Sequence, residues 1–197
     1  MCKETGVYEA RIRGGATLAK TYPVDADLVC GVPDSGLASA KGYSEESGIP
    51  FGLAFHKNSY VGRTFIKPTQ KERESSVKIK LSVLESVVKG KRIVLVDDSI
   101  VRGTTISNLI TMLRKAGATE VHVRISSPPF LYPCYFGTDV PSNKQLIASS
   151  HSTEEIRQQI GADSLGYMPI EELQNMVGDL PICRACFDSH YPMEVPK

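Results

Sequence analysis

A run of apolar residues at positions 93–96, followed directly by Asp97 and Asp98, constrains the fold of this 197-residue chain more than any other feature. The run is short and lacks the alternation of a half-exposed strand, so it predicts a strand buried on both faces, as in a parallel sheet covered by helices. Residues 28–32 have the same character. Residues 121–125 alternate between apolar and polar, which predicts a strand nearer the edge of the sheet.

Helices are expected between and after these strands. Apolar residues in the segment 104–117 recur at the spacing of one helix face, and a glycine at its end is a common helix stop. Residues 36–48 predict a second helix that also ends at a glycine. Residues 152–161 begin with a capping box and predict a third. This alternation predicts an α/β fold with a parallel sheet flanked by helices.

The chain is expected to form one domain with two unequal parts. Residues 1–127 hold the predicted strands and form the expected core. Residues 128–197 open with four prolines between positions 128 and 141, and we expect the sheet to end there and a C-terminal appendage to follow. Residues 56–76 contain five cationic side chains and fit no regular element; loops of this length in compact domains are often functional lids.

Composition excludes several classes of protein. Lysine and arginine number 23 against 22 aspartate and glutamate, so the chain lacks the basic excess of a nucleic-acid-coating protein. No stretch approaches the roughly 18 consecutive apolar residues of a membrane span. The first residues carry an early acid and no apolar run, unlike a signal peptide. These features predict a cytoplasmic protein without nucleic-acid or membrane partners.

The segment after the central apolar run has the residues of a phosphate and sugar site. Asp97 and Asp98 stand at the carboxyl end of the predicted strand, where open α/β sheets bind ligands. A short loop with Gly103 then enters a helix, whose first N–H groups and positive dipole end can hold a phosphate. The two acids could take ribose hydroxyls or hold Mg²⁺ directly or through water. An acidic pair and a capped helix also occur without any ligand, so the residues alone leave both readings open.

Residues 92–105 resemble the phosphoribosyl-pyrophosphate signature of type I phosphoribosyltransferases, and their form at 96–105 resembles the amidophosphoribosyltransferases. The resemblance implies that Asp97 and Asp98 contact the ribose hydroxyls and Mg²⁺. It also implies that the loop after them wraps the 5′-phosphate. The substrate-binding residues of this loop would be Ser99, Ile100, Val101, Arg102, Gly103, Thr104 and Thr105.

Two further segments carry the resemblance. Residues 31–36 resemble the family's pyrophosphate loop, which implies that Asp34, Ser35 and Gly36 bind substrate and that Ser35 is also a Mg²⁺ ligand. From the residues alone this segment is a turn that caps a helix. Residues 57–66 resemble the loop that closes over the substrate, which implies that Lys57 and Arg63 neutralise the pyrophosphate. The family usually has arginine where this chain has serine at position 59.

The resemblance implies a phosphoribosyltransferase that forms 5-phosphoribosylamine from phosphoribosyl pyrophosphate and ammonia, the first committed step of purine synthesis. We expect no counterpart of the family's glutaminase domain here, because Cys2 lacks the residues around that domain's nucleophile. A separate glutaminase domain would then be a partner, and a homo-oligomer is expected. The alternatives are a non-catalytic module that binds phosphoribosyl pyrophosphate or a nucleotide, and an inactive fragment.

The cysteines provide a second signal. Cys183 and Cys186 form a C-x-x-C pair, which in a reducing compartment indicates metal or redox chemistry more often than a disulfide. Together with Cys134 they resemble three of the four ligands of a [4Fe–4S] cluster found in some bacterial members of the family. The spacing of Cys2 does not match the fourth. A zinc site and free thiols remain alternatives, and Cys30 lies in an apolar strand and is expected in the core.

Overall fold

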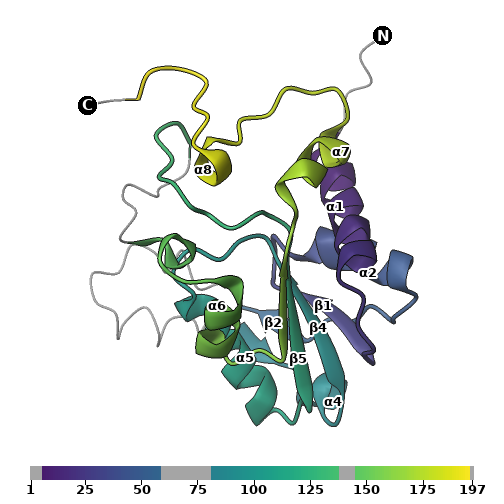
Figure 1. Cartoon of the computed structure of the whole chain (residues 1–197). Coiled ribbons are helices and arrows are strands. Elements are labelled where there is room, and N and C mark those ends of the chain that lie inside the picture. Colours follow the sequence, from purple (N-terminus) through teal and green to yellow (C-terminus); the bar gives the residue numbers. More distant parts are fainter. Residues whose placement is uncertain (1–5, 59–80, 138–144, 196–197) are drawn as a thin grey trace.

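The computed structural model describes residues 6–58, 81–137 and 145–195 (Figure 1). Arg63 and Cys2, both discussed above, lie outside these residues. Within these residues, the main sheet has four parallel strands in the order β1-β4-β5-β6. They are β1 (Leu28–Gly31), β4 (Arg92–Asp97), β5 (Glu120–Ile125) and β6 (Ser164–Tyr167). A second sheet pairs β2 (Phe55–Lys57) with β3 (Leu81–Val83) in antiparallel fashion. The predicted α/β fold with a parallel sheet is confirmed.

Helices cover both faces of the main sheet (Figure 1). One face carries α1 (Val7–Thr21) and α2 (Leu37–Ser47), and the other carries α5 (Thr104–Lys115) and α6 (Thr153–Ile160). Further helical segments in the described part of the chain are α4 (Glu85–Val88), α7 (Leu173–Val177), α8 (Ala185–Asp188), η3 (Ile147–Ser149) and η4 (Ile170–Glu172).

The central strand β4 shows why its sequence is continuously apolar. Ile93 and Leu95 pack into the core cluster under α5, whereas Val94 and Val96 pack into the cluster under α1 and α2. All four side chains are fully buried. Full burial of such a side chain contributes about 1.5–3 kcal/mol each, so both layers depend on this one strand.

The predicted helix boundaries are confirmed. Helix α6 begins with a complete capping box, in which the Ser152 hydroxyl accepts from the Glu155 N–H and the Glu155 carboxylate accepts from the Ser152 N–H. It ends at Gly161, whose φ of +77° is the left-handed conformation that glycine adopts without steric cost. Helices α2 and α5 likewise end before Gly48 and Gly117.

Two expectations about the sheet are wrong. Strand β5 is internal, with β4 on one side and β6 on the other, although its alternating sequence suggested an edge. Two of its polar residues, His122 and Arg124, are buried because they find partners there. Arg124 donates to the Tyr22 carbonyl and the Ser164 hydroxyl, and His122 contacts Ser164. The sheet also continues past residue 128, since β6 pairs with β5 in parallel.

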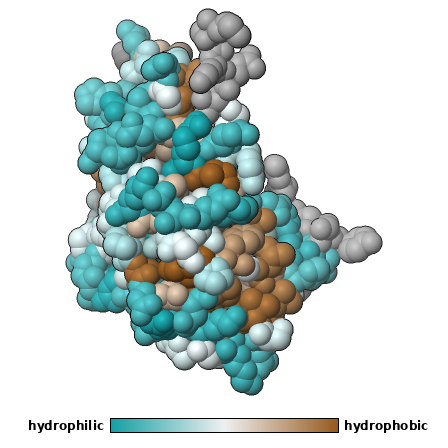
Figure 2. Space-filling model, turned by 90° about the vertical axis from the view of Figure 1, so that its right-hand side faces the viewer, coloured by the Kyte–Doolittle hydropathy of each residue, from teal (hydrophilic) through white to brown (hydrophobic). Residues whose placement is uncertain are grey.

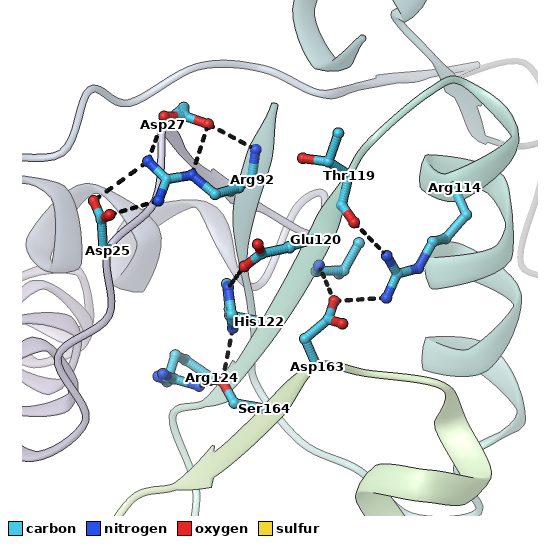
Figure 3. A network of polar contacts seen from close by, with 11 residues as sticks. Asp25, Asp27, Arg92, Arg114, Thr119, Glu120, His122, Arg124, Asp163 and Ser164 are labelled. Carbon is cyan, nitrogen blue, oxygen red and sulfur yellow. Dashed lines mark hydrogen bonds and ion pairs between the residues drawn. The ribbon is translucent and has the colours of Figure 1, made fainter. Parts of the chain in front are cut away.

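The amino ends of the strands are joined by ion pairs (Figure 3). Arg92, the first residue of β4, pairs with Asp25 and Asp27, and its hydrogen bonds to Asp27 lower the pKa of that carboxyl to about 2. Arg114 pairs with Asp163 beside the start of β6. The charged side chains named here therefore pair with one another at the amino edge of the sheet. Asp97 and Asp98 lie at the opposite, carboxyl edge.

The surface is mixed in character. Figure 2 shows a face on which hydrophilic side chains predominate in the upper half and apolar side chains reach the surface lower down. Across the described residues the exposed large hydrophobic side chains include Val7, Tyr8, Phe51 and Leu53. Among the same residues, no helix combines the length and apolar character needed to cross a membrane.

Candidate functional site

The carboxyl ends of β1 and β4 bring two of the predicted loops together. Gly31 and Val96 are paired in register, and the Val32 N–H donates to the Val96 carbonyl at 2.9 Å. Position 36 has no room for a side chain, because a Cβ added there would lie 2.3 Å from the Val96 carbonyl oxygen. The loop at residues 32–36 thus lies directly against the end of the strand that carries Asp97 and Asp98.

The two adjacent acids occupy different environments. Asp97 is buried, with 7% of its surface exposed, whereas Asp98 is exposed. The Asp98 N–H donates to the Asp97 carboxylate at 2.8 Å, and the Ser99 hydroxyl donates to the Asp98 carboxylate at 3.2 Å. Burial, with the negative charge of Asp98 added to it, raises the pKa of Asp97 to about 8. A hydroxyl donor or a cation at this position would relieve the cost of the buried charge.

The loop after the acids presents backbone and hydroxyl donors at the start of α5. Gly103 has a φ of +79° and precedes the helix, whose first turn receives no side-chain cap within the described structure. Thr104 and Thr105 are exposed there. A helix start with open N–H groups and hydroxyls beside it is suited to a phosphate.

Other residues of the same loop hold it in place. Ile100 is buried in the core, and the Val101 carbonyl accepts from the Ile147 N–H at 2.8 Å. The Arg102 guanidinium donates to the side-chain carbonyl of Gln145. Sequence reasoning did not identify Gln145 or Ile147, because no local pattern marks a partner about forty residues away in the chain.

The loop at residues 33–36 carries charges on two sides. Asp34 is exposed and forms an ion pair with Lys57, which ends β2. The peptide bond between Pro33 and Asp34 is cis. Helix α2 starts directly after Gly36. On the other side, Nη1 of Arg11 in α1 lies 3.5 Å from the Ser35 carbonyl oxygen, a contact that sequence reasoning missed.

The cysteine-containing segments are brought together above the sheet (Figure 1). The Cys186 carbonyl accepts hydrogen bonds from the N–H groups of Leu131 and Tyr132 at 3.0 and 3.1 Å, which places the segment with Cys134 beside α8. Burial, together with the nearby charges of Cys134, Cys183 and Asp188, raises the pKa of Cys186 to about 11.

These three thiols are soft donors suited to iron–sulfur or zinc sites. Counting only residues 6–58, 81–137 and 145–195, no group of three His, Cys, Asp or Glu side chains is arranged to hold a metal ion. The three thiols are therefore chemically suited to the expected cluster, but the described residues do not form a complete set of ligands for it.

A small apolar cluster connects the cysteine segments to the phosphate loop. Phe130 and Leu146 are buried, and Val101, Cys186 and Phe187 pack against them. The rings of Phe130 and Phe187 have centroids 5.1 Å apart. The conformation of the loop after Asp98 thus depends in part on the C-terminal region.

Sequence comparison places this chain among proteins of known type. The profile of the phosphoribosyl transferase domain family matches residues 10–126. The amidophosphoribosyltransferase of Bacillus subtilis (strain 168) is 53% identical over 195 residues, covering 96% of this chain and 41% of that protein. The amidophosphoribosyltransferase of Methanocaldococcus jannaschii is 54% identical over 189 residues, covering 96% of this chain and 40% of that protein. The chain spans about two-fifths of the length of these relatives.

Solved structures agree with this assignment. One, described as the allosteric regulatory enzyme of purine biosynthesis, superposes with a TM-score of 0.86 at 52% identity over 98% of this chain and 43% of that chain. The glutamine phosphoribosylpyrophosphate amidotransferase of B. subtilis, complexed with ADP and GMP, gives the same TM-score and identity and is covered to 44%. The expected type I phosphoribosyltransferase fold is confirmed. The chain belongs to the phosphoribosyl transferase domain family, and it is similar throughout its length to the matching part of amidophosphoribosyltransferases.

Proposed function

We propose that this chain transfers the phosphoribosyl group of phosphoribosyl pyrophosphate to ammonia, forming 5-phosphoribosylamine and pyrophosphate, as the first step of purine synthesis. The observation that carries the proposal is the meeting of two loops at the carboxyl edge of the sheet. One contains Asp97 and Asp98, and the other runs from residue 32 to residue 36. The close similarity to amidophosphoribosyltransferases gives the same answer.

The 5′-phosphate is proposed to bind at the start of α5. Thr104 and Thr105 offer exposed hydroxyls, and the open N–H groups after Gly103 offer backbone donors. Ile100 and Val101 contribute through the backbone of the loop, because their side chains are packed into apolar clusters. The substrate-facing residues then extend from Ser99 to Thr105, with Arg102 held by Gln145.

The ribose and pyrophosphate are proposed to lie between the two loops. Asp98 is exposed and well placed to accept from ribose hydroxyls, and Asp97 lies directly behind it. Ser35 and Gly36 would hold the pyrophosphate, and Asp34 would contribute through its backbone, because its carboxylate repels an anion; Lys57 supplies positive charge. Arg63 is proposed for the same role and lies outside the described residues.

Magnesium is proposed as the cofactor, held by Ser35, Asp97 and Asp98. A buried carboxylate with a raised pKa next to an exposed one is a donor set that a hard cation would stabilise. When bound, Mg²⁺ neutralises charge on the pyrophosphate. The residues of the chain orient the ribose carbon, bind the leaving pyrophosphate and exclude water while ammonia attacks that carbon and its bond to pyrophosphate breaks. No covalent nucleophile is required.

The C-terminal cysteines have a proposed structural role. We propose that Cys134, Cys183 and Cys186 bind a [4Fe–4S] cluster, supported by the influence of Cys134 and Cys183 on the pKa of the Cys186 thiol and by the hydrogen bonds of Leu131 and Tyr132 to the Cys186 carbonyl. Residues 128–197 would then complete the domain whose core is residues 1–127. Iron and sulfide analysis of anaerobically purified protein tests this, and a Cys183→Ser change should abolish the cluster. Zinc in place of iron would overturn it.

Ammonia is proposed to come from solution or from a glutaminase domain. A homo-oligomer is also proposed, supported by exposed apolar residues such as Val7 and Leu53, and light scattering on the purified chain tests it.

The proposed reaction is tested by supplying phosphoribosyl pyrophosphate, Mg²⁺ and ammonium at high pH and measuring pyrophosphate release. Release is expected to depend on ammonium and to stop when Mg²⁺ is chelated. Tight binding of phosphoribosyl pyrophosphate without turnover would overturn the proposal and leave a non-catalytic module. Glutamine-dependent release would contradict the expectation that this chain uses only ammonia.

A further inference from the structure

Helix α1 holds an arginine beside the pyrophosphate loop. Its second turn brings Arg11 to the loop that follows β1, where Nη1 lies 3.5 Å from the Ser35 carbonyl oxygen. Ser35 is one of the residues proposed to bind pyrophosphate and Mg²⁺. A cation of the first helix thus contacts the loop at Ser35, next to Asp34, which pairs with Lys57.

The position of this helix is fixed by close backbone packing. α1 and α2 lie side by side (Figure 1). A Cβ added to Gly15 of α1 would lie 1.8 Å from the Ser39 carbonyl oxygen, and one added to Gly42 of α2 would lie 1.9 Å from the Ile12 carbonyl oxygen. Because α2 begins directly after Gly36, the same contact sets the distance between Arg11 and the loop.

The charge of Arg11 is not neutralised within the part of the chain that the structure describes, where no carboxylate forms an ion pair with it. By contrast, Arg92, Arg114 and Arg157 each pair with at least one acid. Arg11 is also exposed, so its guanidinium can leave the Ser35 carbonyl at little cost. Two residues further along the same helix, Arg13 is held by the Met176 carbonyl at 2.7 Å.

We infer that Arg11 is a further binding residue for the pyrophosphate group, acting from the α1 side of the loop while Lys57 acts from the β2 side; this rests on the function proposed above. A guanidinium presents parallel N–H donors that match two oxygens of a phosphate group. Lys57 already pairs with the carboxylate of Asp34, so its charge is partly neutralised. A pyrophosphate bound at this loop therefore needs a second cation. The 5′-phosphate is proposed to bind at the start of α5, so loss of Arg11 is expected to leave its binding unchanged.

The test compares two ligands and three variants of the full chain. Arg11→Gln is expected to raise the dissociation constant of Mg²⁺-pyrophosphate and the KM for phosphoribosyl pyrophosphate by on the order of tenfold. Affinity for ribose 5-phosphate, which lacks the pyrophosphate, is expected to stay within about twofold. Arg11→Lys should retain part of the affinity. Lys20→Gln, which removes the same charge from the far end of α1, should change neither ligand.

The outcomes separate the two proposals. Unchanged pyrophosphate affinity in Arg11→Gln, with an unchanged melting temperature, would overturn the role of Arg11. Equal weakening of ribose 5-phosphate would also overturn it, because it would indicate a general structural effect. Wild-type protein that binds pyrophosphate without turnover would refute the transfer reaction, while the Arg11 comparison would still decide this inference. Wild-type protein that binds no pyrophosphate would refute both.

Discussion

The Asp98 N–H donates a 2.8 Å hydrogen bond to the carboxylate of Asp97, so that one acid of the pair is buried and held by the backbone while the other faces solvent. The two therefore differ in function. Asp98 is the acid that a ligand can approach directly. Asp97 resists ionisation, and its buried carboxyl is stabilised by a proton or by nearby positive charge.

This difference predicts the effect of pH on stability. The pKa of Asp97 is raised by burial from 3.8 to about 8, so the folded chain holds a proton that the unfolded chain has lost between these values. Stability of the ligand-free protein should therefore fall as pH rises from 4 to 8 through this group. Asp97→Asn should remove that component and raise the free energy of unfolding at pH 8 by about 1 kcal/mol or more. It should also weaken binding of phosphoribosyl pyrophosphate.

Urea unfolding of wild type and Asp97→Asn at pH 5 and pH 8 provides the measurement. Asp25→Asn is the matched control, because Asp25 is a highly exposed acid at the opposite edge of the sheet. If Asp97→Asn is less stable than wild type at pH 8, burial of the ionised Asp97 carboxyl does not destabilise the fold, and the prediction is wrong.

The ion pair between Asp34 and Lys57 predicts a specific loss of substrate affinity. Lys57→Met should raise the KM for phosphoribosyl pyrophosphate by about tenfold, because it removes a cation from the loop and leaves Asp34 to repel the pyrophosphate. Steady-state kinetics of pyrophosphate release measures this. Lys89→Met changes a surface lysine paired with Glu85 and should have no effect. A KM for Lys57→Met equal to that of wild type would exclude contact with substrate.

The close approach of the two loops predicts that position 36 must be glycine. In Gly36→Ala the new Cβ would meet the Val96 carbonyl oxygen at 2.3 Å, so the loop must move away from the end of β4. We expect a loss of roughly 1–3 kcal/mol in stability and weaker substrate binding. Gly137→Ala, where nothing lies within 4 Å of the added Cβ, is the control for thermal unfolding. Unchanged substrate affinity in Gly36→Ala would show that the loop tolerates displacement.

The apolar cluster of Phe130, Leu146, Val101, Cys186 and Phe187 predicts that a substitution in the C-terminal region weakens phosphate binding by the loop after Asp98. Phe187 packs with Phe130 near Val101, so Phe187→Ala should reduce stability by about 2–4 kcal/mol and loosen the loop. Binding of ribose 5-phosphate, measured by calorimetry, should weaken as well. Phe136→Ala removes an exposed ring from the same region and should leave that binding intact. An unchanged affinity of Phe187→Ala for ribose 5-phosphate would show that the phosphate loop does not depend on the packing of the C-terminal region.

The sequence predicted the parts of the site that depend on local patterns. The buried strand and the two acids after it follow from a continuous apolar run and its polar end, and α5 and α6 follow from their apolar spacing and glycine stops. β6 was missed because it is short and contains a glycine. The position of β5 was misjudged because Arg124 is satisfied by the carbonyl of Tyr22, about a hundred residues away.

Contacts between distant segments account for what else could not be predicted. Arg11 reaches a backbone carbonyl rather than a side chain, so no residue pairing in the sequence marks it. Gln145 binds Arg102 across a separation of 43 residues. Such partners become visible only when the packing of helices and loops is known.

The most direct test of the proposed transfer is the rate of ammonium-dependent pyrophosphate release from phosphoribosyl pyrophosphate by wild type, Asp98→Asn and Asp25→Asn, with saturating Mg²⁺. We predict release by wild type, release by Asp25→Asn at nearly the same rate, and a loss of at least about a hundredfold in Asp98→Asn. Wild-type release with an undiminished rate in Asp98→Asn would contradict the placement of the ribose and Mg²⁺ at these acids. No release by any of the three would contradict the transfer reaction itself.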